Sequence, residues 1–132
     1  MQIIQPEGWP KPRGYTNGIL TEGKTLYIGG QIGWDEQEVF GSDDFVEQVR
    51  QALLNTVAIL NAGGARPEHI VRMTWYITDK EEYLQSLKQL GRVYRDVIGQ
   101  HYPVMAMVQV VALIEDQAKV EIETTAVLPH ER

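Results

Sequence analysis

The segment from Lys119 to Val127, KVEIETTAV, alternates apolar and polar side chains and still places two carboxylates in its middle. An alternation with a period of two is typical of a β-strand whose two faces meet different surroundings. Glu121 and Glu123 would lie on one face, so the two sides of the sheet that contains this strand are expected to differ. The apolar face would carry Val120, Ile122, Thr124 and Ala126.

Two amphipathic helices are predicted, and they would pack on the apolar side of that sheet. Asp44 and Glu47 resemble a capping box before the first helix, and Gly63 supplies a stop after it. The second helix is predicted to begin after Thr78, which pairs with Glu81 as another capping signal, and to end near Gly99. Apolar residues recur at helical spacing at Phe45, Val46, Val49, Leu53, Val57 and Leu60, and again at Tyr83, Leu84, Leu87, Leu90, Tyr94 and Val97.

Strand and turn signals complete a ββαβαββ order. The turn at Gly23 predicts a hairpin between residues 15–20 and 25–33, and a further strand is expected over 71–78. A second hairpin is predicted between 104–113 and 119–127. Its first arm would face the helices with Ala106, Val108, Val110 and Ala112. Residues 1–132 are thus predicted to form one α+β domain, a mixed sheet with two helices on one face.

The other face of the predicted sheet indicates self-association. Two helices in a chain of 132 residues can cover only one face of a sheet of four or five strands. The uncovered face would be largely apolar, and apolar surfaces of this kind usually mark interfaces. We therefore expect a homo-oligomer in which Glu121 and Glu123 lie near a subunit interface and need a partner or a ligand there. The apolar members of this face would be Met105, Met107, Val111 and Leu113.

Composition excludes several classes of site. The chain has no cysteine, which removes disulfides, thiolate nucleophiles and cysteine-ligated metals. The formal net charge is −6, from 18 acidic and 12 basic residues, and no basic stripe is visible, so a nucleic-acid partner is disfavoured. His69, His101 and His130 lack metal-ligand spacing, and no glycine cluster has dinucleotide or phosphate-loop spacing, so neither a metal nor a cofactor is expected. Without a signal peptide or a long apolar run, the protein is predicted to be cytoplasmic and to make no membrane contact.

Six local signatures together resemble the YjgF/RidA family. They are GYTNG at 14–18, LYIGGQI at 26–32, QVRQALLNTVAILNAGGA at 48–65, HIVRMTWYITD at 69–79, YPVMA at 102–106 and KVEIETTAVL at 119–128. The resemblance implies a chorismate-mutase-like α+β fold and a homotrimer whose sheets face inward as a barrel, with ligand clefts between subunits. It also implies hydrolysis of reactive enamines and imines, made by pyridoxal-phosphate enzymes, to keto acids and ammonia.

The resemblance carries three of the four features of the family's site onto this chain. Tyr15 in GYTNG would border the cleft, and the backbone at Gly29 and Gly30, before Gln31, would contact the ligand. Glu121 in the last strand would be the acid/base that positions a water. Two of these residues also have plain structural interpretations: Tyr15 as a half-buried strand aromatic, and Glu121 as a carboxylate paired across the interface.

The family's arginine is missing. Its position falls on Met105 in YPVMA. In the family this guanidinium clamps the substrate carboxylate with two parallel hydrogen bonds, and a thioether cannot hold an anion. Met105 would instead line an apolar pocket or pack at the interface, and Arg13, two residues before Tyr15, is a candidate for a cation from another direction.

The sequence therefore predicts a small-molecule-cleft protein of the RidA type. The leading interpretation is a divergent enamine/imine deaminase-type hydrolase, weak on 2-iminobutanoate and 2-iminopropanoate because Met105 replaces the arginine. A non-catalytic ligand-binding or regulatory trimer is the alternative. An endoribonuclease, a label attached to parts of this family, is disfavoured by the acidic balance.

Overall fold

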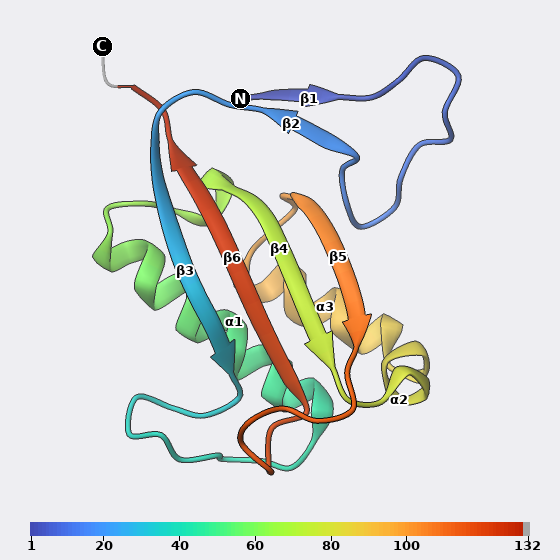
Figure 1. Cartoon of the computed structure of the whole chain (residues 1–132), viewed down its shortest axis with the longest axis vertical. Coiled ribbons are helices and arrows are strands. Elements are labelled where there is room, and N and C mark those ends of the chain that lie inside the picture. Colours follow the sequence, from blue (N-terminus) through green and yellow to red (C-terminus); the bar gives the residue numbers. More distant parts are fainter. Residues whose placement is uncertain (131–132) are drawn as a thin grey trace.

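The computed structural model describes residues 1–130 and has an α+β architecture, with the helices on one side of a four-stranded sheet (Figure 1). The first half of the chain contains β1 (Gln2–Ile4), β2 (Gly18–Leu20), β3 (Lys24–Ile32), α1 (Phe45–Ala62) and the 3-10 turn η1 (Pro67–His69). The second half contains β4 (Ile70–Ile77), α2 (Lys80–Gln85), α3 (Leu87–Val97), β5 (Val104–Gln109) and β6 (Val120–Leu128). The single second helix of the prediction is therefore two, which meet at Ser86.

The last strand lies inside the sheet, and the predicted hairpin of β5 and β6 is wrong. The strand order is β3-β6-β4-β5, with β6 antiparallel to both of its neighbours and β5 parallel to β4 at the edge. Burial explains the arrangement. The helix-facing side of β6 is almost completely buried, whereas β5 keeps several exposed residues, as an edge strand can. All four residues predicted for the apolar face, Val120, Ile122, Thr124 and Ala126, are buried, and Val127 is buried as well.

The predicted faces of β5 are reversed. Met105 pairs with Met73 and Met107 pairs with Trp75, and paired residues on adjacent strands point to the same side. Met73 and Trp75 are buried beneath the helices, so both β5 methionines point toward the helices and pack against the core. Ala106, predicted to face the helices, is instead exposed, as is Val108. A shift of one residue in an assumed register is enough to invert a strand in this way.

The first predicted hairpin is also wrong, because β2 pairs with β1 and not with β3. The segment before β2 is held at the opposite edge of the sheet, beside the start of β5. There the Thr16 amide donates to the Pro103 carbonyl at 3.0 Å and its hydroxyl donates to the Tyr102 carbonyl at 2.6 Å. The chain then turns at Gly23, which has φ +145° and whose Cβ would collide with the Leu128 carbonyl, so only glycine fits.

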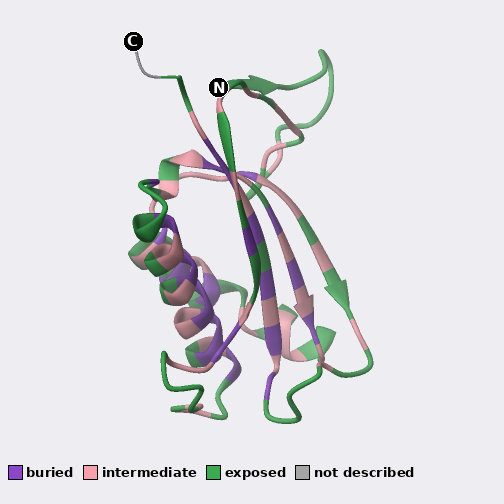
Figure 2. Cartoon of the chain, turned by 60° about the vertical axis from the view of Figure 1, so that its left-hand side comes forward, coloured by how far each residue is buried: buried purple, intermediate pink, exposed green. Residues whose placement is uncertain are grey.

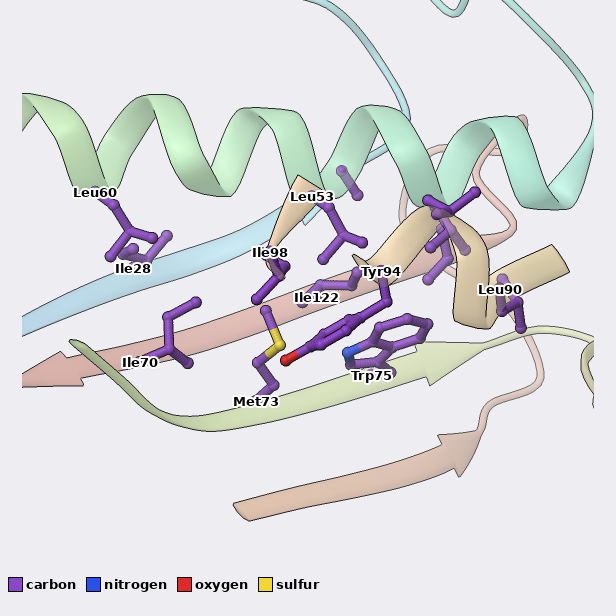
Figure 3. Close-up of a cluster of buried hydrophobic side chains, with 14 of the residues drawn as sticks. Ile28, Leu53, Leu60, Ile70, Met73, Trp75, Leu90, Tyr94, Ile98 and Ile122 are labelled. Atoms are coloured by element: carbon purple, nitrogen blue, oxygen red, sulfur yellow. The ribbon is translucent and has the colours of Figure 1, made fainter. Parts of the chain in front are cut away.

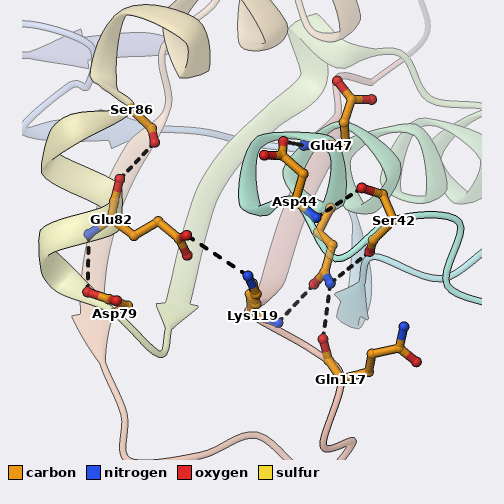
Figure 4. Close-up of polar contacts among 9 residues, drawn as sticks. Ser42, Asp44, Glu47, Asp79, Glu82, Ser86, Gln117 and Lys119 are labelled. Atoms are coloured by element: carbon orange, nitrogen blue, oxygen red, sulfur yellow. Dashed lines mark hydrogen bonds and ion pairs between the residues drawn. The ribbon is translucent and has the colours of Figure 1, made fainter.

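A buried glutamine fixes α1 to the beginning of β6 (Figure 4). Gln48 is 1% exposed and donates from Nε2 to the carbonyls of Ser42 (3.1 Å) and Gln117 (3.0 Å). Its Oε1 accepts from the Lys119 amide at 2.8 Å. Because every polar atom of this side chain is satisfied, the contact sets the position of the residues that follow, Glu121 among them.

The helix ends follow the predicted chemistry in part. Asp44 caps α1, with its carboxylate accepting from the Glu47 amide at 3.0 Å, as predicted. At α2 the cap is Asp79, which accepts from the Glu82 amide at 3.1 Å, and not the predicted Thr78. Between the helices and the sheet lies one continuous apolar core, part of which is drawn in Figure 3.

The opposite side of the sheet has no helix over it (Figure 2). Tyr27, 79% exposed, and Val108, 42% exposed, lie on this open face together with Tyr76 and the glutamates of β6. No helix within residues 1–130 is long and apolar enough to cross a membrane.

Candidate functional site

The Glu121 carboxylate lies against β3 where two successive residues of that strand, Gly29 and Gly30, have no side chain. The β3–β6 ladder shifts register between Ile28 and Gln31, so Gly29 and Gly30 form a bulge opposite this part of β6. A Cβ on Gly30 would come within 2.6 Å of the Glu121 carboxyl carbon, whereas a Cβ on Gly29 would meet nothing within 4 Å. Glycine at 30 is therefore what allows the carboxylate to lie against the β3 backbone. Bulges of this kind often accompany active sites, where they re-aim a side chain.

Glu121 lies between two strand partners, Ile32 on β3 and Tyr76 on β4. Next to Ile32, the Gln31 side chain donates to the Gly29 carbonyl at 3.2 Å. The second glutamate has a partner of its own, because the Tyr76 hydroxyl donates to a Glu123 carboxylate oxygen at 3.5 Å. Tyr76 and both glutamates belong to the open face of the sheet, whereas Gln31 pairs with Ile122 of the helix-facing side.

Tyr15 and Met105 come together elsewhere, in a cavity of about 470 Å³ between β4, β5 and α3. Tyr15 is 43% exposed at its rim, in the segment that Thr16 fastens to the start of β5. Arg13, the alternative cation, also lines this cavity. The remaining lining residues are Gly14, Trp75, Tyr83, Leu87, Leu90, Gly91, Tyr94, Arg95, Tyr102 and Met107.

The predicted site residues therefore form two separate groups on opposite faces of one sheet. Glu121, beside Gly30, occupies the open face, whereas Met105 points toward the helices. The prediction that Glu121 and Met105 share a face is wrong, because β5 is parallel to β4 and has its faces reversed. A single chain does not bring these two groups into one site.

The wall of the cavity is fixed by buried aromatic contacts. Tyr94 stacks on Tyr102 with ring centroids 5.6 Å apart, and its hydroxyl donates to the His101 carbonyl at 2.6 Å. Burial, and to a smaller extent the neighbouring Tyr102, raises the pKa of Tyr94 well above its usual value. The His101 ring in turn donates from Nε2 to the Ile70 carbonyl at 2.6 Å. The Tyr94 hydroxyl therefore stays protonated at ordinary pH, and its contacts are structural.

Trp75, Gly91 and Arg95 are among the cavity residues that the sequence did not assign to a site. Trp75 looks like an ordinary strand aromatic, and Arg95 like an exposed helix residue. Gly91 did carry a signal, because a glycine in a helix interior is unfavourable by about 1 kcal/mol relative to alanine and suggests a local reason.

No group of three or more potential metal ligands occurs among residues 1–130. His69 accepts a hydrogen bond from the Arg66 amide at 3.0 Å, and His130 lies 3.4 Å from a Glu22 carboxylate oxygen.

Comparison with known proteins decides the family. The model of the family described as Endoribonuclease L-PSP matches residues 10–128, nearly the whole chain. The chain belongs to the YjgF/RidA family. One relative, the human 2-iminobutanoate/2-iminopropanoate deaminase, is 30% identical over 114 residues, which cover 86% of this chain and 79% of that protein.

Two solved structures of the family share the fold. The Yersinia pestis Rid-family protein YyfB, of unknown function, superposes with a TM-score of 0.85 at 27% identity and covers 96% of this chain and 98% of its own. Escherichia coli TdcF with bound serine has a TM-score of 0.68 at 32% identity and covers 97% of this chain and 99% of its own. The fold class predicted from the sequence is thereby confirmed.

Proposed function

We propose that this protein is an enamine/imine deaminase-type hydrolase whose site is completed between copies of the chain in a homotrimer. The observation that carries the proposal is the Glu121 carboxylate, laid against Gly30 on a sheet face that no helix covers. A carboxylate held beside exposed backbone, in a family that includes imine deaminases, is suited to activating water.

The chemistry assigned to Glu121 is proton transfer. Its carboxylate accepts a proton from a water whose oxygen adds to the imine carbon, and passes this proton to the imine nitrogen to give a neutral carbinolamine. The carboxylate then takes the hydroxyl proton and delivers it to the nitrogen as the carbon–nitrogen bond breaks, which leaves a ketone and ammonia. The backbone around Gly29 offers polar groups at the same place, with the Gln31 amide steadying its carbonyl.

The homotrimer part of the proposal follows from the separation of the two residue groups. The cavity with Tyr15 and Met105 opens on the helix side of one chain, and Glu121 lies on the open side. A second copy that packs against the open face would bring its own cavity rim toward Glu121. The exposed Tyr27 and Val108 on this face favour such packing.

Met105 favours a second candidate, a non-catalytic ligand-binding trimer. Without a guanidinium at this position, small imino acids lose a charge-assisted clamp, and we expect their turnover to fall on the order of a hundredfold. A nuclease is not proposed, because the net charge of −6 opposes binding to a polyanion.

Glu121→Gln tests the proposal, with Glu123→Gln as the matched control on the same strand and face. We expect Glu121→Gln to abolish hydrolysis of imines while particle mass and melting temperature stay unchanged, and Glu123→Gln to keep activity. A weakened assembly in Glu121→Gln would mean that the carboxylate is structural. Unchanged turnover would remove Glu121 from the mechanism.

A further inference from the structure

We propose that the cavity beneath α3 selects anionic ligands that carry a bulky, planar apolar group, in place of the small imino acids that the human relative's name describes. This inference rests on the proposed function and names its substrate class: imino or enamino acids with aromatic or large branched side chains. It is carried by the size, lining and charge of the cavity.

The cavity is large and mostly aromatic or aliphatic. Its volume of about 470 Å³ falls within the range of about 300–1,000 Å³ that is usual for small-molecule sites. A dry cavity of about 150 Å³ already accommodates a benzene ring, so this one has room for a ring and a charged group together. Tyr83, Tyr102 and Leu90 provide flat or apolar walls. A ligand with only two or three carbons would leave most of this surface without a partner.

The charge of the cavity is opposite to that of the protein. Arg13 and Arg95 line it, and no aspartate or glutamate does, although the chain as a whole has a net charge of −6. Within residues 1–130 neither arginine forms an ion pair. Two guanidinium groups without carboxylate partners are well suited to an anionic ligand, which Met105 cannot hold.

Gly91 lies beside one of these arginines. It lies in the interior of α3, where glycine is unfavourable, and its φ is not in the left-handed region. The one atom that a Cβ would meet within 4 Å is Arg95 Nη1, at 3.4 Å. The backbone therefore does not require glycine at this position. Its effect is to leave the wall of the cavity open beside the Arg95 guanidinium, since a Cβ would fill this space at contact distance.

Trp75 adds an unused hydrogen-bond donor. The indole is 3% exposed, lines the cavity, and has no acceptor for its Nε1 among the described residues. Figure 3 shows the indole beside the ring of Tyr94 under the helix layer. Its partner on β5 is Met107, an unbranched side chain that readily changes rotamer. A carbonyl or carboxylate oxygen on a ligand can satisfy this donor once the thioether shifts.

Binding of stable probes tests the inference without turnover. Calorimetry compares 3-phenylpropanoate, its neutral counterpart 3-phenylpropanamide, and butanoate. We expect 3-phenylpropanoate to bind at least about tenfold more tightly than either of the others, since one lacks the charge and the other the ring. Equal binding of the amide, or equal or tighter binding of butanoate, would overturn the inference.

Variants then locate the contacts. Arg95→Gln and Arg13→Gln should each weaken 3-phenylpropanoate about tenfold. Arg92→Gln on α3 and Lys11→Gln in the N-terminal loop, neither of which lines the cavity, should bind as the parent does. Gly91→Ala should weaken the probe while raising the melting temperature, a combination that a purely structural role does not produce. Parent-like affinity in both Arg95→Gln and Arg13→Gln would refute the assignment of the anion to these side chains.

Turnover separates this inference from the proposed function. Imines are released in situ from phenylalanine and from 2-aminobutanoate by an amino-acid oxidase, and their hydrolysis is followed. Preference for the aromatic imine supports both statements. Selective probe binding with no hydrolysis of either imine keeps the ligand class and refutes the hydrolase. Faster hydrolysis of the small imine keeps the hydrolase and refutes the ligand class. A protein that shows no probe binding and no hydrolysis of either imine refutes both statements.

Discussion

Gly30→Ala is a single-methyl test of the Glu121 position. The new Cβ would lie 2.6 Å from the Glu121 carboxyl carbon and 2.8 Å from its Cγ. Ordinary contact begins near 3.4 Å and the carboxylate Oε2 would lie nearer still than the carboxyl carbon, so the carboxyl group has to retreat by roughly 1 Å or more. A displacement of about 1 Å at a reacting group can cost on the order of a hundredfold in rate, and we expect a loss of this size in kcat/KM for imine hydrolysis.

Stability should barely change in the same variant. Pushing a side chain about 30° from its rotamer costs roughly 0.5–1.5 kcal/mol, while alanine in place of a strand glycine contributes about 0.5–1 kcal/mol. These two terms nearly cancel. Gly29→Ala is the matched control for stability: its Cβ meets nothing, so only the gain remains, about 2–5 °C in melting temperature for a chain of this size.

A double-mutant cycle measures the coupling directly. In a Glu121→Ala background the carboxylate is gone, and Gly30→Ala should then stabilise the protein as much as Gly29→Ala does. Thermal unfolding of the four proteins, with kcat/KM for those that retain Glu121, completes the experiment. If Gly30→Ala retains full activity, or if its effect on stability is the same with and without Glu121, the reasoning about this contact is wrong.

Three further predictions concern assembly, the missing arginine and alkaline pH. Sedimentation should give a mass of about three chains, and a stable monomer at micromolar concentration would contradict the composite site. Met105→Arg should raise affinity for small 2-oxo acids about tenfold in calorimetry; no gain would mean that the cavity has lost the family's geometry. Because burial raises the pKa of Tyr94 above the value of about 10 expected in the unfolded chain, stability should be full below pH 10 and fall as pH rises beyond it. Denaturant unfolding should show this slope much reduced in Tyr94→Phe, and an unchanged slope would assign it elsewhere.

The sequence predicted those features that depend on local pattern. Alternation assigned the faces of β6 correctly, since its buried side is strongly apolar. Helical spacing with Asp44 placed α1, whose cap is the predicted one. Tyr15 was identified through a motif, and the structure places it at the rim of the same cavity as Met105.

The local sequence pattern does not determine which strands that are distant in sequence pair with each other. A turn-like loop before β6 is compatible with a hairpin and equally with a crossover that leaves β5 parallel to β4. The predicted hairpin implies a wrong register for β5. Because side chains alternate along a strand, that register assigns Met105 to the wrong face of the sheet. Arg95 and Trp75 were missed for a related reason: only tertiary packing brings α3 over β4.

The position of β6 has a consequence for how the chain folds. The strand β6, which is central to the sheet, follows all the other strands in the sequence. Among residues 1–130, β3 has no sheet partner other than β6, with Lys24 opposite Leu128. Contacts between such distant segments must overcome a large loop-closure entropy, so folding of this topology is expected to be slow for its size. Until β6 inserts, β3 and one edge of β4 present unpaired backbone, and this interval is when the newly made chain is most prone to aggregate.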